Sequence, residues 1–314
     1  MFMAPDSWRD LFHNTLRNVR NGEISEDRLN DAVRRILRVK IRAGLFDKPK
    51  PSARKFAGDF DLLGGPEHRA VAREAVRKSL VLLKNESDVL PISSDSTVLI
   101  TGSAAHEMTV QTGGWTLSWQ GSGNDRQDFP NGETIWEGLA TAIAAGGGNP
   151  ILSPDGSYDT RPDIAIVVYG EPPYAEFQGD RGDIAFRDPA GHLETLQRLR
   201  EAGIPTVSVF LSGRPMWTNR LINASDAFVA AWLPGSEGGG IADVLIGDER
   251  GAPRFDFTGR LSFSWPNHPN HAELHDGSGT ALFALGYGHD YDSPQSVAAL
   301  DPKHSYALRQ QTGR

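Results

Sequence analysis

The chain has 314 residues and a formal net charge of −8, with 39% hydrophobic and 23% charged residues. This acidic balance argues against a nucleic-acid or anionic-membrane partner, because phosphate groups are bound by clustered lysine and arginine. No apolar run approaches the roughly 20 residues that cross a bilayer, and residues 1–20 lack the apolar core of a signal peptide. The absence of cysteine removes disulfides, thiolate metal sites and cysteine nucleophiles. We therefore expect a globular protein that acts on a neutral ligand.

The first 45 residues predict a helical segment that is separate from the rest. Ser25 can cap a helix with an acidic first turn, and Gly44 ends it. Its apolar residues recur at helical spacing, namely Leu29, Val33, Ile36 and Leu37. The basic residues of this region are interpreted as its solvated face. Residues 46–66 are rich in lysine, proline, serine and glycine, which is typical of a linker.

Helices and strands are expected to alternate from Pro66 onward, a favoured first residue of a helix. The sequence predicts helices over residues 67–78, 133–145, 190–202, 215–223 and 237–247. It predicts strands over residues 79–84, 97–101, 164–169, 205–211 and 226–232, with an added edge strand at 261–265. This order predicts an α/β fold, with a mostly parallel, doubly wound sheet covered by helices on both faces. Residues 292–314 are polar and without pattern, so we expect a tail there.

The strand at residues 164–169 leads directly into an acidic loop. That loop carries Glu171, Glu176 and Asp180 within ten residues. In parallel sheets, ligands bind beyond the carboxyl ends of the strands, so carboxylates at this place are candidates for chemistry. The alternative is a solvated acidic loop, because acidic side chains are mostly exposed.

Three other predicted strands also end close to polar side chains. His106 stands alone, and without a second histidine at ligand spacing we expect no metal site. Arg214 suits either an ion pair or a substrate contact. Glu237 suits the electrostatics of a helix N-terminus as well as a site.

Two tryptophans, Trp115 and Trp119, lie in a glycine-rich polar loop. Indoles in such a loop favour stacking on a flat or pyranose-like ligand, and the alternative is packing against a neighbouring domain. The glycine-rich segment 234–240 lacks the Gly-Lys-Ser/Thr ending and the dinucleotide fingerprint. We therefore expect no nucleotide or other cofactor, and we interpret these glycines as close packing of strand against helix.

Several short motifs follow the predicted strands. They are Gly113-Gly-Trp-Thr, Trp119-Gln-Gly, Val168-Tyr-Gly-Glu-Pro-Pro-Tyr-Ala-Glu with Gly179-Asp180, Ser212-Gly-Arg-Pro, and Ala231-Trp-Leu-Pro-Gly-Ser-Glu-Gly. Together they resemble the C-terminal α/β sandwich domain of glycoside hydrolase family 3, in its β-glucosidase and glucan exohydrolase branch. The resemblance places the sandwich at residues 67–291 and likens residues 1–45 to the last segment of the family's (β/α)₈ barrel. The family suggests a periplasmic or extracellular location.

The resemblance implies a retaining hydrolase that removes terminal β-D-glucosyl residues from a β-glucoside or β-glucan oligosaccharide. Such an enzyme needs two carboxylates, one as nucleophile and one as acid/base. Glu171 matches the acid/base, with Glu176 as the alternative, and the aspartate nucleophile belongs to the barrel. The expected substrate-binding residues are Trp115, Trp119, Glu176, Asp180 and Arg214. Glu176 and Asp180 could also act by adjusting the proton affinity of Glu171.

The nucleophile segment Ser-Asp-Trp of that family is absent, and Asp6-Ser7-Trp8 has the order reversed. We therefore expect the barrel to be supplied in cis or in trans, and this chain alone to lack turnover. The alternative function is a stand-alone, non-catalytic carbohydrate-binding module that uses Trp115 and Trp119.

Overall fold

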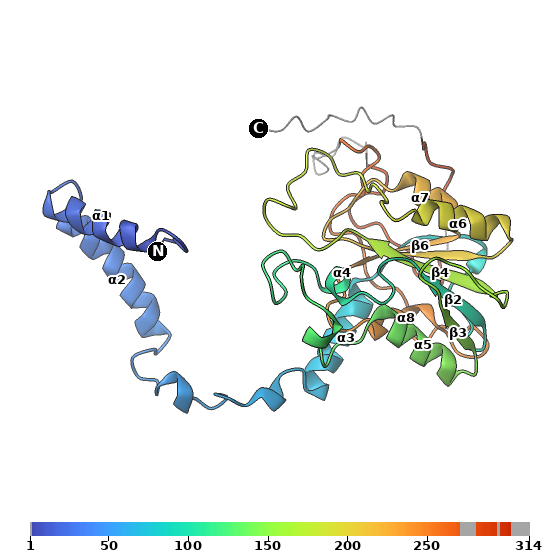
Figure 1. Cartoon of the computed structure of the whole chain (residues 1–314), viewed down its shortest axis with the longest axis horizontal. Coiled ribbons are helices and arrows are strands. Elements are labelled where there is room, and N and C mark those ends of the chain that lie inside the picture. The colour runs from blue at the N-terminus through green and yellow to red at the C-terminus, as the bar shows by residue number, and fades with distance from the viewer. Residues whose placement is uncertain (1, 271–280, 294–295, 303–314) are drawn as a thin grey trace. The chain divides into compact units, whose positions relative to one another are not determined.

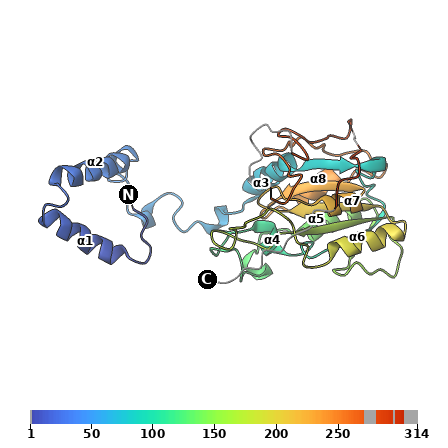
Figure 2. The ribbon, with the colours of Figure 1, turned by 90° about the horizontal axis from the view of Figure 1, so that it is seen from above.

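The computed structural model describes residues 2–270, 281–293 and 296–302, and it divides the chain into two compact units, Met1–Leu63 and Gly64–Arg314. The first unit contains α1 (Trp8–Arg20) and α2 (Glu26–Arg42), which are joined by a short turn (Figure 2). Ser25 caps α2 as predicted, because its Oγ accepts the Arg28 backbone N–H at 3.2 Å. None of the described helices is long and apolar enough to cross a membrane.

The second unit is built on a six-stranded sheet with the order β1-β6-β5-β4-β2-β3. All neighbouring strands are parallel except β1, which is antiparallel to β6. The strands are β1 (Val81–Asn85), β2 (Thr97–Thr101), β3 (Asn149–Leu152), β4 (Ile164–Gly170), β5 (Thr206–Leu211) and β6 (Ala227–Trp232). The helices are α3 (Pro66–Ser79), α4 (Met108–Thr112), α5 (Ile135–Ala145), α6 (His192–Glu201), α7 (Asn219–Ala224) and α8 (Gly239–Leu245). Short 3₁₀ turns occupy Pro51–Ala53, Phe60–Leu62, Glu86–Asp88 and Arg126–Asp128. The predicted fold class is confirmed.

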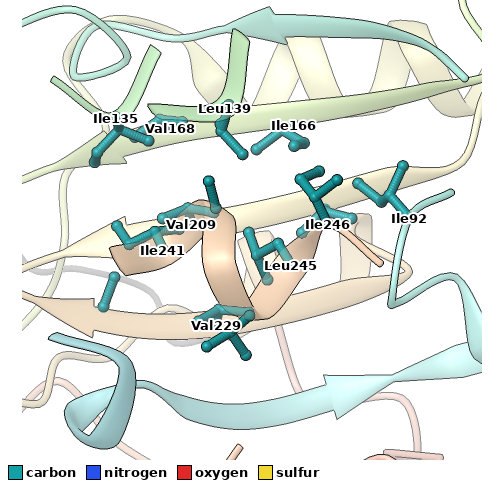
Figure 3. Close-up of a cluster of buried hydrophobic side chains, with 14 of the residues drawn as sticks. Ile92, Ile135, Leu139, Ile166, Val168, Val209, Val229, Ile241, Leu245 and Ile246 are labelled. Atoms are coloured by element: carbon teal, nitrogen blue, oxygen red, sulfur yellow. The ribbon is translucent and has the colours of Figure 1, made fainter. Parts of the chain in front are cut away.

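Both faces of the sheet are buried, which explains the unbroken apolar runs of its strands. Successive side chains of a strand point to opposite faces: Ile166 belongs to one core cluster, whereas Val167 belongs to the other. Helices α3, α5 and α8 cover the first face, and α6 and α7 cover the second (Figure 1). Figure 3 shows the first cluster, where side chains of α5 and α8 lie against those of the central strands.

The structure differs from the predicted elements at three places, one of which is the five-residue helix α4, which was not predicted. Strand β3 was not predicted, because it has only four residues and contains Pro150, which a strand tolerates at the edge that β3 occupies. The edge strand predicted at residues 261–265 is wrong. That segment contributes an isolated bridge between Trp265 and Phe283 instead of a regular strand.

Part of the predicted tail packs against the core of the second unit, to which it belongs. The Asn223 side chain exchanges two hydrogen bonds with the backbone of Leu300, at 2.8 and 2.9 Å. Val297 and Leu300 also pack against the α6 and α7 side of the core. Residues 294–295 and 303–314 of that predicted tail lie outside the described residues.

The strand order creates a switch point between β2 and β4. After β2 the chain adds β3 on one side, and it then returns to place β4 on the other side of β2. Gly102, directly after β2, lets the strands exit close together, since a Cβ there would lie 2.3 Å from the Val168 carbonyl oxygen. Ligands of doubly wound sheets bind in the crevice at such a point. A ligand site is therefore expected at the loops that follow β2 and β4.

Core packing is tested by shortening a side chain of α5. Leu139 is fully buried against the sheet, and Leu139→Ala is expected to lower the free energy of unfolding by about 2–5 kcal/mol, because it leaves a cavity. Leu285→Ala is the control, since this side chain is 62% exposed and its loss should cost no more than about 0.5 kcal/mol. Urea unfolding followed by far-UV circular dichroism measures both. Equal losses would contradict the core assignment.

Candidate active site

Glu171 is the first residue after β4, and it is only 6% exposed. Its backbone N–H donates to the Leu211 carbonyl at 3.0 Å, which continues the pairing of β4 with β5. Gly170 allows this close approach, because a Cβ there would lie 2.0 Å from the Leu211 oxygen. The sheet therefore fixes the backbone position of Glu171.

Two arginines pair with the buried Glu171 carboxylate. Arg214 binds it with two hydrogen bonds, from Nη2 to Oε1 at 2.8 Å and from Nε to Oε2 at 3.1 Å. Arg181 adds a bond from Nη1 to Oε1 at 3.2 Å. A buried carboxylate requires such charged, hydrogen-bonding partners. Of the two roles that the sequence left open for Arg214, the structure contains the ion pair.

Arg214 also organises the loop that follows Glu171. Its Nη1 donates to the Gly179 carbonyl at 2.8 Å, and its guanidinium stacks 4.3 Å from the centre of the Tyr174 ring. Burial acts to lower the pKa of Arg214, but the hydrogen bonds and charge of Glu171 outweigh it, so the pKa is raised. Burial, together with the Glu171 carboxylate, raises the pKa of Tyr174 to about 12. Near neutral pH, Arg214 is therefore a cation and Tyr174 a neutral phenol.

Arg181 also binds the later part of the same loop. Its Nη2 donates to Asp183 at 3.2 Å and to the Ala185 carbonyl at 2.6 Å, and Arg187 also pairs with Asp183, at 2.6 Å. A cavity of about 220 Å³ opens beside this network. Its lining includes Glu171, Pro172, Tyr174, Arg181, Phe186 and Arg214. The cavity can hold a small ligand next to the Glu171 carboxylate.

The loop after β2 brings the two predicted tryptophans to the loop of Glu171. Trp115 and Trp119 are 69% and 46% exposed, and their ring centroids are 6.2 Å apart. Both indole N–H groups donate to Glu176 Oε2, at 3.0 and 2.8 Å. The hydrogen bond from Trp119 lowers the pKa of Glu176. Phe177 lies edge-on to Trp119, at 5.7 Å between centroids.

Hydrogen bonds from a side chain to the backbone, and a close backbone approach, also join these two loops. The Gln120 side chain accepts the Ala175 N–H at 2.7 Å and donates to the Glu176 carbonyl at 2.9 Å. A Cβ at Gly114 would lie 2.0 Å from the Tyr174 carbonyl oxygen. Gly114 is therefore required by the distance between the loops, whereas the sequence analysis connected it only with the family motif.

The other candidate residues at the sheet edge have separate partners. His106 Nδ1 lies 2.8 Å from Thr134 Oγ1. Glu237 is buried and pairs with Arg69 at 2.9 Å, ahead of α8 rather than within its first turn. Asp180 lies on the loop of Glu171, and its backbone N–H donates to the Phe177 carbonyl. The structure thus joins Glu171 with Arg214, and Glu176 with both tryptophans, but it does not join His106 or Glu237 to either group.

The sequence analysis missed Arg181 and Tyr174. Both lie within the acidic loop, but only the folded loop shows that Arg181 returns to Glu171 and that Tyr174 supports Arg214. Also unpredicted is His192, which pairs with Asp188, accepts the Ser103 N–H and stacks on Tyr169. Within the described ranges, no group of three or more metal-ligating side chains could hold a metal ion.

The close approach of the two loops is tested at Gly114. Gly114→Ala is expected to displace the tryptophan loop and alter the near-UV circular dichroism, because the new methyl group meets the Tyr174 backbone. Gly182→Ala is the matched control, since nothing lies within 4 Å of its Cβ position. A tryptophan signal that is unchanged in Gly114→Ala would contradict the contact.

The acceptor role of Glu176 predicts a pH dependence. Because its pKa is lowered from the ordinary 4.5, the carboxylate is more than half ionised at that pH, and the ionised acceptor is lost as the pH falls through the lower pKa of the folded state. Tryptophan fluorescence should therefore change with a midpoint below pH 4.5, before far-UV circular dichroism reports unfolding. Glu176→Gln should remove the change. A midpoint above 4.5 would contradict the lowered pKa.

Comparison with known proteins shows which family has this architecture. The sequence model of the glycosyl hydrolase family 3 C-terminal domain matches residues 80–291. The crystal structure of an exo-1,3/1,4-β-glucanase from a Pseudoalteromonas species is similar over 96% of this chain and 38% of its own, with a TM-score of 0.91 and 49% identity.

Two curated relatives are a lysosomal β-glucosidase of Dictyostelium discoideum and a periplasmic β-glucosidase of Salmonella typhimurium. They are 33% and 27% identical over 86% and 79% of this chain. The chain spans 35% of the length of each. It belongs to glycosyl hydrolase family 3, whose C-terminal domain it contains.

Proposed function

We propose that this chain is the acid/base-bearing part of a retaining β-glycoside hydrolase that releases terminal β-D-glucosyl residues from β-glucosides or β-glucan oligosaccharides. The observation that carries the proposal is the buried Glu171, which lies at the switch point of the sheet and lines a cavity. Its relatives include β-glucosidases and an exo-β-glucanase, which supports the reaction class.

The chemistry divides into two steps that need two carboxyl groups. In the first, a carboxylate attacks the anomeric carbon while an acid protonates the departing oxygen. In the second, the same acid, now a base, deprotonates the water that attacks the glycosyl–enzyme bond. Glu171 is assigned the acid/base role, and the nucleophile is an aspartate on a (β/α)₈ barrel supplied in cis or in trans.

Glu171 is favoured over Glu176 by the surroundings of the two carboxylates. Glu171 lines the cavity, whereas one oxygen of Glu176 accepts both tryptophan N–H groups.

The exposed indoles of Trp115 and Trp119 supply an aromatic wall for the sugar on the leaving-group side, where the flat ring face meets the C–H groups of a pyranose. Asp180 is assigned to hydrogen bonding with sugar hydroxyls. Arg214 contributes through its pair with Glu171. The residues of the wall and the acid/base thus come from the loops after β2 and β4.

One observation favours a second candidate, a non-catalytic carbohydrate-binding module. The indoles are exposed and held by residues of the second unit alone, so they can meet a sugar without the barrel. In such a module Glu171 would have only a structural role.

The catalytic assignment is tested by Glu171→Gln in a polypeptide that joins this chain to a family 3 barrel. Hydrolysis of cellobiose is expected to fall by about 10²–10⁴-fold, because its leaving group needs a proton. An aryl glucoside with an acidic phenol should keep its glycosylation rate, which the initial burst measures. Glu201→Gln, on the exposed end of α6, is the control. Unchanged hydrolysis of cellobiose by Glu171→Gln would transfer the role to Glu176, whereas an unmutated joined polypeptide without turnover would favour the binding module.

A further inference from the structure

His192 is a buried histidine at the start of α6, with 4% of its surface exposed, and the proposed reaction does not use it. Its Nε2 accepts the Ser103 backbone N–H at 3.2 Å, and its Nδ1 pairs with Asp188 Oδ1. A backbone N–H can only donate, so Nε2 carries no proton in this contact, and Nδ1–H donates to Asp188. The two partners therefore select one neutral tautomer of the ring.

The imidazole of His192 also lies against a buried ring of the sheet. It stacks on Tyr169 of β4, with ring centroids 4.9 Å apart and an angle of 19° between the planes. Tyr169 is itself fixed, because its hydroxyl donates to Ser208 Oγ of β5 at 2.9 Å. His192 thus connects α6 to β4 and, through Ser103, to the loop after β2.

Asp188 completes this arrangement from the turn that precedes α6. It has a backbone φ of 45°, a left-handed conformation that is uncommon for a residue other than glycine. Its carboxylate accepts the backbone N–H of His192 at 3.0 Å and of Leu193 at 2.7 Å, two of the groups that a helix leaves without partners at its start. Burial acts to raise the pKa of Asp188, but the hydrogen bonds from His192 and Leu193 outweigh it, so the pKa is lowered. Near neutral pH, an ionised Asp188 therefore stabilises both the left-handed turn and the start of α6.

The turn that contains Asp188 forms one wall of the cavity beside Glu171. The residues of this segment that line the cavity, here called the outer wall, are Phe186, Arg187 and Pro189. The outer wall is attached to the fold at its beginning, where the Phe186 N–H donates to the Trp217 carbonyl at 3.2 Å. Asp188 attaches it to α6 through His192 and Leu193. Loss of this second attachment would displace the outer wall and leave the backbone of Glu171 on its strand.

We propose that Asp188 and His192 are positioning residues, which hold the outer wall in place for the sugar that departs in the proposed reaction. The inference rests on the proposed function, since it assumes that the cavity receives this leaving-group sugar. Neither residue is among the described residues that line the cavity, so both act through the outer wall. The bond to Ser103 ties the pair to the end of β2, the strand beside β4.

The first test measures the tautomer of His192 in the full chain, with its nine histidines labelled with ¹⁵N. Long-range ¹H–¹⁵N spectra at slightly alkaline pH distinguish a ring protonated at Nδ1 from one protonated at Nε2, and His192→Gln assigns the signals. The wild type should show the Nδ1–H tautomer. Asp188→Ala should change the His192 signals and leave those of the other eight histidines in place, which also shows an intact fold.

The second test uses the polypeptide that joins this chain to a family 3 barrel. In Asp188→Ala, KM for cellobiose should rise about tenfold with kcat nearly unchanged, because a displaced outer wall binds the leaving-group sugar less well without moving the acid/base. KM for methyl β-glucoside, whose leaving group is too small to reach the outer wall, should stay the same. Asp188→Asn keeps an acceptor oxygen and should restore part of the affinity for cellobiose. Glu201→Gln, on the exposed end of α6, is the control and should change neither KM.

Several outcomes would overturn the positioning role alone. They are an Nε2–H tautomer in the wild type, an unchanged KM for cellobiose in Asp188→Ala, and an equal rise of KM for both substrates, which would indicate a general loss of structure. If Asp188→Ala does not fold, Asp188→Asn and His192→Gln provide the same comparison of substrates. An unmutated joined polypeptide without turnover would count against the proposed function and the positioning role together.

Discussion

Burial of the Glu171 carboxylate is the constraint that shapes the loop after β4. A carboxyl group that is 6% exposed needs hydrogen-bonding partners within the protein. Arg214, beyond β5, supplies two bonds, but Arg181 lies only ten residues along the same loop. The loop must therefore turn back on itself to bring Arg181 to Glu171. Glu176 lies within that turn, between Glu171 and Arg181 in the sequence.

The sheet brings the second loop to the same place. Because β2 and β4 are neighbours on either side of the switch point, the segments that leave them start side by side. The final approach depends on glycine, since a side chain at Gly114 would collide with the Tyr174 backbone. Parallel pairing of β2 and β4 thus places the two loops side by side, and Gly114 allows them to come into contact. Glu176 then connects the loops, because its side chain accepts hydrogen bonds from both tryptophans.

The elements that could be predicted from the sequence are those whose signal is local. The apolar run at 164–169 identifies β4, and the alternation of elements indicates the parallel sheet. The short β3 gave no signal, because four residues that include a proline have no periodicity to detect. At the candidate site, residue types and motifs indicated Glu171, Glu176 and both tryptophans as candidates. The partners of these residues could not be predicted, because the bonds from Arg181 to Glu171 and from the indoles to Glu176 depend on how the loops fold in three dimensions.

The ion pairs also bear on how Glu171 would exchange a proton in the proposed reaction. Its Oε1 accepts from both Arg181 and Arg214, Oε2 accepts the Arg214 Nε–H, and Tyr174 also hydrogen-bonds to the carboxyl group. An oxygen that carries a proton must give up hydrogen bonds that it accepts along the same direction. Protonation of either oxygen therefore competes with at least one bond from arginine. For Glu171 to act as an acid in the proposed reaction, its pairing with the arginines must loosen at the oxygen that carries the proton.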